Sequence, residues 1–162
     1  MTILKWLLIS GLLLVLLAVA AGQLGFLRGR MPDDLGVREG KLKRPSFTPN
    51  SVSSQAALWP GHPQLAYARI APLPLAGDGV ATMARIQALV RALPGAEVVK
   101  AEGAYLHVTV TTRLMRFTDD LEFWLDPAAA VVQVRSASRV GRKDLGVNRA
   151  RVEALRAQLA AR

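Results

Sequence analysis

Two short polar stretches late in the sequence hold the residues most able to do chemistry. One stretch, 113–122, contains the adjacent carboxylates Asp119 and Asp120, and the other, 135–149, is rich in Arg and Ser. Arginine side chains and the free N–H groups at the start of a helix both bind anions. One interpretation is a polar pocket for an anionic ligand, with these candidate binding residues: Arg116, Asp119, Asp120, Arg135, Ser136, Ser138, Arg139, Asn148 and Arg149.

The same side chains also permit a purely structural interpretation. If the strands on either side of 127–130 pair as a hairpin, Asp120 and Glu122 approach Arg135 across the ladder. The result would be a network of cross-strand ion pairs, with a cap at Asn148 that fixes the last helix. Both interpretations stay open from the sequence.

A third polar patch lies earlier in the chain, where 50–55 reads Asn-Ser-Val-Ser-Ser-Gln. Side chains of these types commonly hydrogen-bond nearby backbone groups. They can also line a pocket, and Asn50 and Ser53 are therefore added to the ligand-binding candidates.

Catalysis is the alternative function, in which a hydrolase-like enzyme would use Asp119 or Asp120 with Arg116 and Ser136. Adjacent residues of a strand point to opposite faces, so the two carboxylates do not readily share one substrate. A serine nucleophile also needs a base, and the two histidines of the chain show no triad-like spacing. The balance favours a protein that is not an enzyme, and we assign no catalytic residue.

The sequence offers few residues that could bind a metal, a cofactor or a nucleic acid. The chain has no Cys, which excludes disulfides, thiolate zinc sites and iron–sulfur clusters, and it has only two His. We expect no metal and no cofactor. The last 28 residues hold eight Lys or Arg, but no aromatic residue interleaves with them, so we expect anionic lipid rather than nucleic acid as the partner.

These candidates belong to a chain of 162 residues with a net charge of +9, long enough for one domain and an appendage. The appendage is N-terminal, because residues 6–27 carry no charge and are mainly Leu, Val, Ile and Ala. A helix of that length extends about 33 Å, and the hydrocarbon core of a bilayer is about 30 Å thick. We predict a transmembrane anchor over 1–27, with the lipid bilayer as the partner of residues 6–27.

A cleaved signal peptide is the alternative for the same segment. Lys5 would be its basic start and Ala18-Val19-Ala20 its cleavage site. The apolar character continues through Leu27, past that site, and this favours an uncleaved anchor.

Proline marks the next section of the chain. Seven of the nine Pro lie between 31 and 74, and because Pro fixes φ and removes a backbone donor, we predict an extended, ordered arm over 28–64. An α+β domain is expected over 65–162. Its predicted elements are strands at 66–71, 97–102, 105–115, 121–125 and 131–137, a helix from Asp78 to Pro94, and a helix from about Arg149 with Asn148 as its N-cap. Short connections between the later strands indicate an antiparallel sheet, packed with two main helices on one face.

Four segments resemble signatures of the domain of unknown function 1499 family, which occurs in bacteria and plastids: 49–55, 116–123, 134–139 and 144–149. The resemblance covers about residues 31–160. In many members a Cys stands where this chain has Ser51, so a role that needs a thiol is not available here. The family has no established activity, and the resemblance implies a single domain, commonly behind a signal, a lipid anchor or a transmembrane segment.

Two signals oppose each other on the orientation of the domain. Six Lys or Arg follow the apolar segment between 28 and 44, and the positive-inside rule would place them in the cytoplasm. The signal-like start and the family resemblance favour export. We expect a single-pass protein of the inner (cytoplasmic) membrane with a periplasmic domain. A cytoplasmic domain, or a cleaved protein secreted to the periplasm, is the alternative.

The predicted function is therefore that of a membrane-anchored, extracytoplasmic, non-catalytic envelope module. Its partner would be an anionic ligand, a lipid headgroup or another membrane protein.

Overall fold

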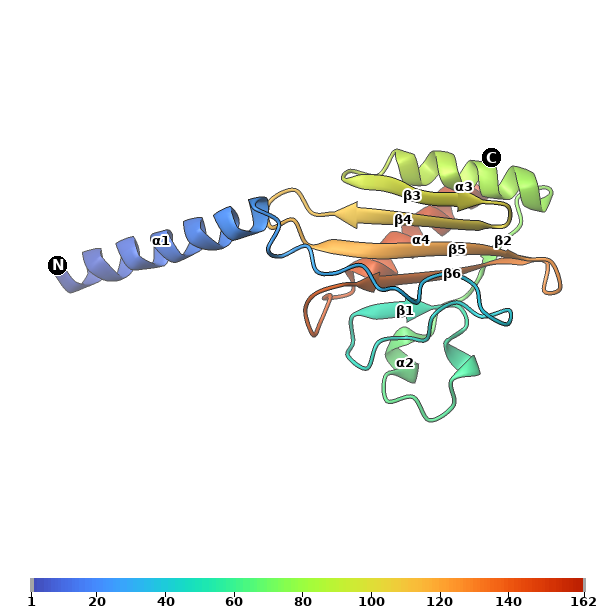
Figure 1. The fold of residues 1–162 in the computed structure, drawn as a ribbon, viewed down its shortest axis with the longest axis horizontal. Coiled ribbons are helices and arrows are strands. Elements are labelled where there is room, and N and C mark those ends of the chain that lie inside the picture. The colour runs from blue at the N-terminus through green and yellow to red at the C-terminus, as the bar shows by residue number, and fades with distance from the viewer. Residues whose placement is uncertain (1, 162) are drawn as a thin grey trace.

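The computed structural model describes residues 2–161 and shows one long helix projecting from an α+β domain (Figure 1). In chain order the elements are α1 (Thr2–Gln23), β1 (Ser51–Ser53), the 3-10 turn η1 (Ala56–Leu58), α2 (Leu65–Ala68), β2 (Leu73–Pro74), α3 (Gly79–Arg91), β3 (Ala96–Glu102), β4 (Tyr105–Thr111), β5 (Thr118–Asp126), β6 (Val131–Ser138) and α4 (Val147–Ala160). The predicted α+β class and the N-terminal apolar helix are confirmed.

The strands form one sheet in the order β1-β6-β5-β4-β3, and β2 also pairs with β6. Each of these pairings is antiparallel. The four strands from β3 to β6 follow one another as hairpins, which the short connections predicted. In the central hairpin Glu122 stands opposite Arg135, and Asp120 stands opposite Ala137.

The hydrophobic core lies between one face of the sheet and the helices α3 and α4. Alternate residues of a strand point to the same face, and on β5 this places the fully buried Leu121 and Phe123 in the core. The helices contribute Ile86, Val90, Val152, Leu155 and Leu159. The predicted N-cap of α3 is confirmed, because the Asp78 carboxylate accepts a hydrogen bond from the Ala81 N–H at 2.6 Å.

The opposite face of the sheet is covered by residues 24–50, which we call the connector (Figure 1). The Gly36 N–H donates to Glu122 in the middle of β5 at 2.9 Å. The Leu42 N–H donates to the side chain of Gln55 at 2.8 Å, and Leu42 is only 1% exposed. The connector therefore lies on the domain as an ordered segment.

Three local predictions differ from the structure. The strand predicted at 66–71 is wrong, because Leu65–Ala68 closes a helical turn and only Arg69 makes an isolated bridge, to Ser53. The strand predicted at 105–115 ends at Thr111, because 112–117 folds into a tight loop in which Arg116 has a φ of 58°. The strand β1 falls within the predicted arm and adds to the edge of the sheet.

α1 is the one helix among the described residues with the length and composition to cross a membrane, and a signal sequence would have the same properties. Its domain end meets the loop between β4 and β5. The Gln23 side-chain amide donates to the carbonyls of Arg113 and Leu114 at 3.0 and 2.8 Å. Gly22 packs directly on the backbone of Met115.

The turn from α3 into β3 generates a prediction about stability. Gly95 has a φ of 75°, and a Cβ at this position would collide with the backbone oxygen of Thr111. Gly77 has a φ of 95° with no atom near its Cβ position, so it is a matched control. The left-handed conformation alone costs an Ala roughly 1–2 kcal/mol. We expect Gly95→Ala to lower the free energy of unfolding clearly more than Gly77→Ala, measured by urea unfolding in detergent. Equal losses would contradict the close approach.

Candidate functional site

The first polar cluster lies on the face of the sheet beneath the connector. The Asp120 carboxylate accepts hydrogen bonds from Nε and Nη2 of Arg139 at 2.8 and 2.7 Å, and it lies 2.8 Å from Nε2 of His107. The Asp120 side chain is 2% exposed. Burial by itself would raise the pKa of Asp120, but the hydrogen bonds from Arg139 and His107 outweigh it, and the pKa lies below its usual value. Asp120 is therefore held as a carboxylate.

The next pair along β5 and β6 is also buried. Nη1 of Arg135 donates to Glu122 at 3.0 Å, which confirms the predicted approach of these two residues across the hairpin. The other oxygen of Glu122 accepts from the Tyr105 hydroxyl at 2.8 Å and from the Gly36 N–H at 2.9 Å. Burial, together with the nearby charge of Glu122, raises the pKa of Tyr105, so its phenol stays protonated as a donor.

A cavity of about 340 Å³ lies beside these pairs, between the connector and β6. Four cationic side chains line it against one carboxylate, Asp120. Arg30 and Lys43 come from the connector, and Arg135 and Arg139 come from β6 and the residue after it. Three of these cations are ion-paired, Lys43 with Asp34, Arg135 with Glu122 and Arg139 with Asp120. The charge left for a negatively charged occupant is therefore that of Arg30.

Two buried polar atoms of the lining have no hydrogen-bond partner within residues 2–161: Nε of Arg135 and Oδ1 of Asn50. A buried donor or acceptor without a partner costs free energy. Ser46 and Thr48 add hydroxyl groups to the same cavity. The donors suit an anion, and the free acceptor of Asn50 suits a proton carried by that anion, as in a hydrogen phosphate or a hydroxylated phosphate ester.

The second polar cluster lies on the helix side of the sheet and centres on Asn148. The Asn148 amide donates to Asp144 at 2.9 Å, to the Ser138 hydroxyl at 3.0 Å and to the Asn50 carbonyl at 3.2 Å. Its oxygen accepts from the Ser136 hydroxyl at 2.5 Å. This cluster ties α4, β6 and the segment before β1 together.

The predicted cap of the last helix is wrong. Gly146, with a φ of 84°, precedes a helix that begins at Val147, and this turns Asn148 inward. The helix start is occupied by Asp144, which accepts from the N–H groups of Gly146 and Asn148 at 3.1 and 3.2 Å. At this helix start the N–H groups of Gly146 and Asn148 are thus bonded to a carboxylate of the chain and that of Val147 to the Asp144 carbonyl, so none of the three is free to bind an anion.

Arg151 completes the second cluster and is not among the candidates predicted from the sequence. Its guanidinium donates to Asp119 at 2.7 Å, to Asn148 at 2.9 Å and to Ser136 at 3.2 Å. Arg151 follows Asn148 by three residues, a spacing that places both on one side of a helix. That spacing is the feature of the sequence that could have identified Arg151 as a neighbour of Asn148.

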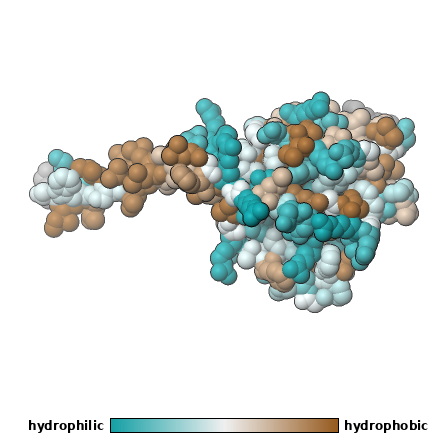
Figure 2. All heavy atoms as spheres, viewed as in Figure 1, coloured by the Kyte–Doolittle hydropathy of each residue, from teal (hydrophilic) through white to brown (hydrophobic). Residues whose placement is uncertain are grey.

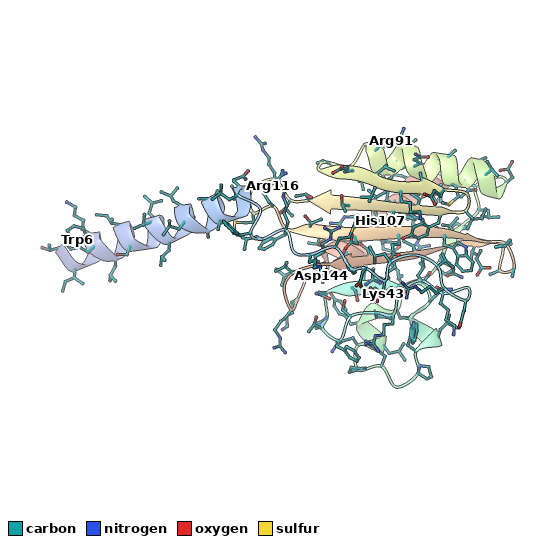
Figure 3. The ribbon with its side chains drawn as sticks, viewed as in Figure 1. Trp6, Lys43, Arg91, His107, Arg116 and Asp144 are labelled. Atoms are coloured by element: carbon teal, nitrogen blue, oxygen red, sulfur yellow. The ribbon has the colours of Figure 1, made fainter. Side chains whose placement is uncertain are left out.

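The structure divides the remaining candidates among several places. Asn50, Asp120, Arg135, Ser138 and Arg139 line the cavity. Ser53 accepts from the Gln55 N–H at 3.2 Å, and Arg149 donates to the carbonyls of Tyr67 and Arg69 at 2.5 and 3.0 Å. Arg116 lies in the loop beside the end of α1 (Figure 3). The cavity residues Arg30, Lys43, Ser46 and Thr48 were missed, because a tertiary contact brings the connector there and leaves no local pattern.

The hydrolase constellation does not assemble. Asp119 and Asp120 lie in separate clusters on opposite faces of the sheet, as the alternation of a strand predicts. Ser136 is fully buried and donates to an amide oxygen, which is not a base. Within residues 2–161, no group of three or more metal-binding side chains is placed to hold a metal ion.

A comparison with protein families identifies the chain. The family described as Protein of unknown function (DUF1499) matches residues 41–159, and the chain belongs to this family, as the resemblance predicted. No curated protein and no solved structure matches the chain.

The buried pair of Glu122 and Arg135 generates a prediction. Glu122→Gln leaves the Arg135 charge buried without its partner, a loss that typically costs about 3–5 kcal/mol. The matched control is Glu153→Gln, which removes a half-exposed carboxylate paired with Arg156 and should cost no more than about 1 kcal/mol. Urea unfolding measures both. Losses of similar size would show that leaving the Arg135 charge without its buried partner costs no more than breaking an exposed pair.

Proposed function

We propose that this member of the family is a membrane-anchored, non-catalytic module that binds a small anionic group in the cavity between the connector and β6. The carrying observation is the buried Nε of Arg135, an unpartnered donor of a lining residue that lies in the same cavity as the cation Arg30. A phosphate, sulfate or carboxylate group would satisfy this donor and pair with Arg30.

Preorganisation supports the proposal. Arg135 and Arg139 are already held by Glu122 and Asp120, so they lose little side-chain freedom when a ligand arrives. Lys43 forms an ion pair with Asp34 on the connector, beside the cavity. The cavity of about 340 Å³ is large enough for a phosphate ester or a comparably small anion.

The proposal assigns a separate role to each of three parts of the chain. Residues 1–27 act as the anchor in the inner membrane and 28–64 as the arm, whose connector part covers one face of the sheet and supplies one wall of the cavity. Residues 65–162 act as the domain that supplies the opposite wall. The length and apolar composition of α1 support the anchor. The signal-like start at Lys5 supports a domain on the periplasmic side.

Ligand binding can be tested with inorganic phosphate on the full chain in detergent. Phosphate at about 100 times Kd is expected to raise the free energy of unfolding by about 2.7 kcal/mol relative to chloride at equal ionic strength. Arg30→Gln removes an exposed cation of the lining and should weaken binding by roughly tenfold or more, since a charged hydrogen bond contributes about 1.5–3 kcal/mol.

The control for this test is Arg38→Gln, an exposed cation of the same connector that does not line the cavity. It should bind phosphate like the original chain. No stabilisation by phosphate would overturn the proposal. An equal loss in both variants would mean that phosphate responds to overall charge and not to the cavity.

The orientation is tested by reporter fusions at the C-terminus. A periplasmic domain predicts an active alkaline phosphatase fusion and resistance from a β-lactamase fusion. An inactive phosphatase fusion beside an active cytoplasmic reporter would place the domain in the cytoplasm, in line with the basic residues that follow α1.

A further inference from the structure

Three segments meet at the end of the domain from which α1 emerges: 24–28, 112–117 and 140–143. The Gln23 hydrogen bonds fix α1 to the second segment. The third lies against the chain just after the first, because a Cβ on Gly29 would come within 2.6 Å of the Val140 side chain. The Arg139 N–H donates to the Thr118 carbonyl at 3.1 Å, which joins the third segment to the second. We call these three segments together the interfacial surface.

The charged residues of the interfacial surface are all basic. It contains five basic residues and no acidic residue: Arg28, Arg113, Arg116, Arg142 and Lys143. It also exposes large apolar side chains, with Leu24 75%, Phe26 77% and Leu114 61% exposed. Figure 2 shows hydrophilic side chains projecting from the domain where the hydrophobic helix enters it. Exposed apolar groups among cations are typical of surfaces that contact anionic membranes.

The position of α1 sets the depth of this surface. α1 has 22 residues, and a helix of that length extends about 33 Å, close to the hydrocarbon thickness of about 30 Å. Gln23, its last residue, is hydrogen-bonded to the loop at 113–114. If α1 crosses the bilayer, that loop lies at the level of the lipid headgroups. This step rests on the anchor included in the proposed function.

A groove beside the loop has the chemistry of a headgroup site. Its volume is about 570 Å³, and its lining combines Arg113, Arg116 and Arg151 with the apolar Leu93, Pro94 and Val110. Arg151 is paired with Asp119, so Arg113 and Arg116 carry the charge available to a ligand. A lipid phosphate suits the arginines, and the glycerol and upper acyl carbons suit the apolar wall.

We propose that the interfacial surface docks on the membrane that holds α1 and that its groove takes the phosphate of an anionic phospholipid. Docking would hold the domain against the bilayer in one orientation instead of letting it swing from α1. Arg116, a ligand candidate that does not line the cavity under the connector, then has a place in this second site.

The chain has no Cys, so one introduced cysteine gives a unique label for testing the contact. The full chain carrying Leu114→Cys, with a fluorophore on that cysteine, is reconstituted in phosphatidylcholine vesicles with or without phosphatidylglycerol. Lipids with a nitroxide near the headgroup quench fluorophores at that depth. The control label is Ala129→Cys in the exposed β5–β6 turn, at the opposite end of the sheet. We expect quenching at 114 to exceed quenching at 129 severalfold, and phosphatidylglycerol to increase it.

Charge removal tests the lipid specificity. Arg113→Gln with Arg142→Gln, both added to the 114-labelled chain, should lower the docking equilibrium constant in phosphatidylglycerol vesicles by about fivefold per residue. The matched control is Arg38→Gln with Lys100→Gln, two exposed cations that line another cavity over β3. It should leave the quenching unchanged.

Three outcomes overturn the inference. The first is equal quenching at 114 and 129. The second is quenching at 114 that changes neither when phosphatidylglycerol is added nor when the Arg residues are replaced. This result would mean that the surface contacts the membrane without recognising the headgroup. The third is burial of the label at position 114 that occurs only when a partner protein is present. Extraction of the vesicles with alkaline carbonate separates these from failure of the anchor, because only an unanchored chain is released.

Discussion

Glu122 and Arg135 face each other across β5 and β6, and both side chains are almost completely buried. Burying two charges costs free energy, which pairing and hydrogen bonds to their other polar atoms offset. Glu122 meets this requirement with the Tyr105 hydroxyl and the N–H of Gly36. Because Gly36 belongs to the connector, the pair ties the chain that follows α1 to the middle of the sheet.

The connector thereby acts as a second covering layer. The helices α3 and α4 bury the apolar face of the sheet, and the connector buries a face that carries His107, Asp120 and Arg135. Its path brings Arg30 and Lys43 opposite the cations of β6, which creates the cationic cavity. The same path brings α1 against the β4–β5 loop. One segment thus sets both the proposed ligand cavity and the proposed contact with the membrane.

Elements with a strong local pattern could be predicted from the sequence. The hairpins from β3 to β6 and the Asp78 cap of α3 were found, because alternation and capping are local signals. The strand β1 has three residues, too few for a pattern, and its place is decided by pairing with β6. The residue type of Asn148 predicts a cap, whereas Gly146 and Asp144 start the helix earlier.

By itself, the sequence determined the apolar helix, the α+β class, the family and the opposite facing of Asp119 and Asp120. These follow from composition and from the two-residue period of a strand. Both can be recognised from residues that are close together in the sequence. Only the tertiary structure decided which charges share a cavity. Arg30 lies 105 positions before Arg135 in the chain, and their approach depends on a connector held down by buried charge on the sheet. No local pattern predicts that contact, because the interactions that stabilise it join buried polar groups that lie far apart in the sequence.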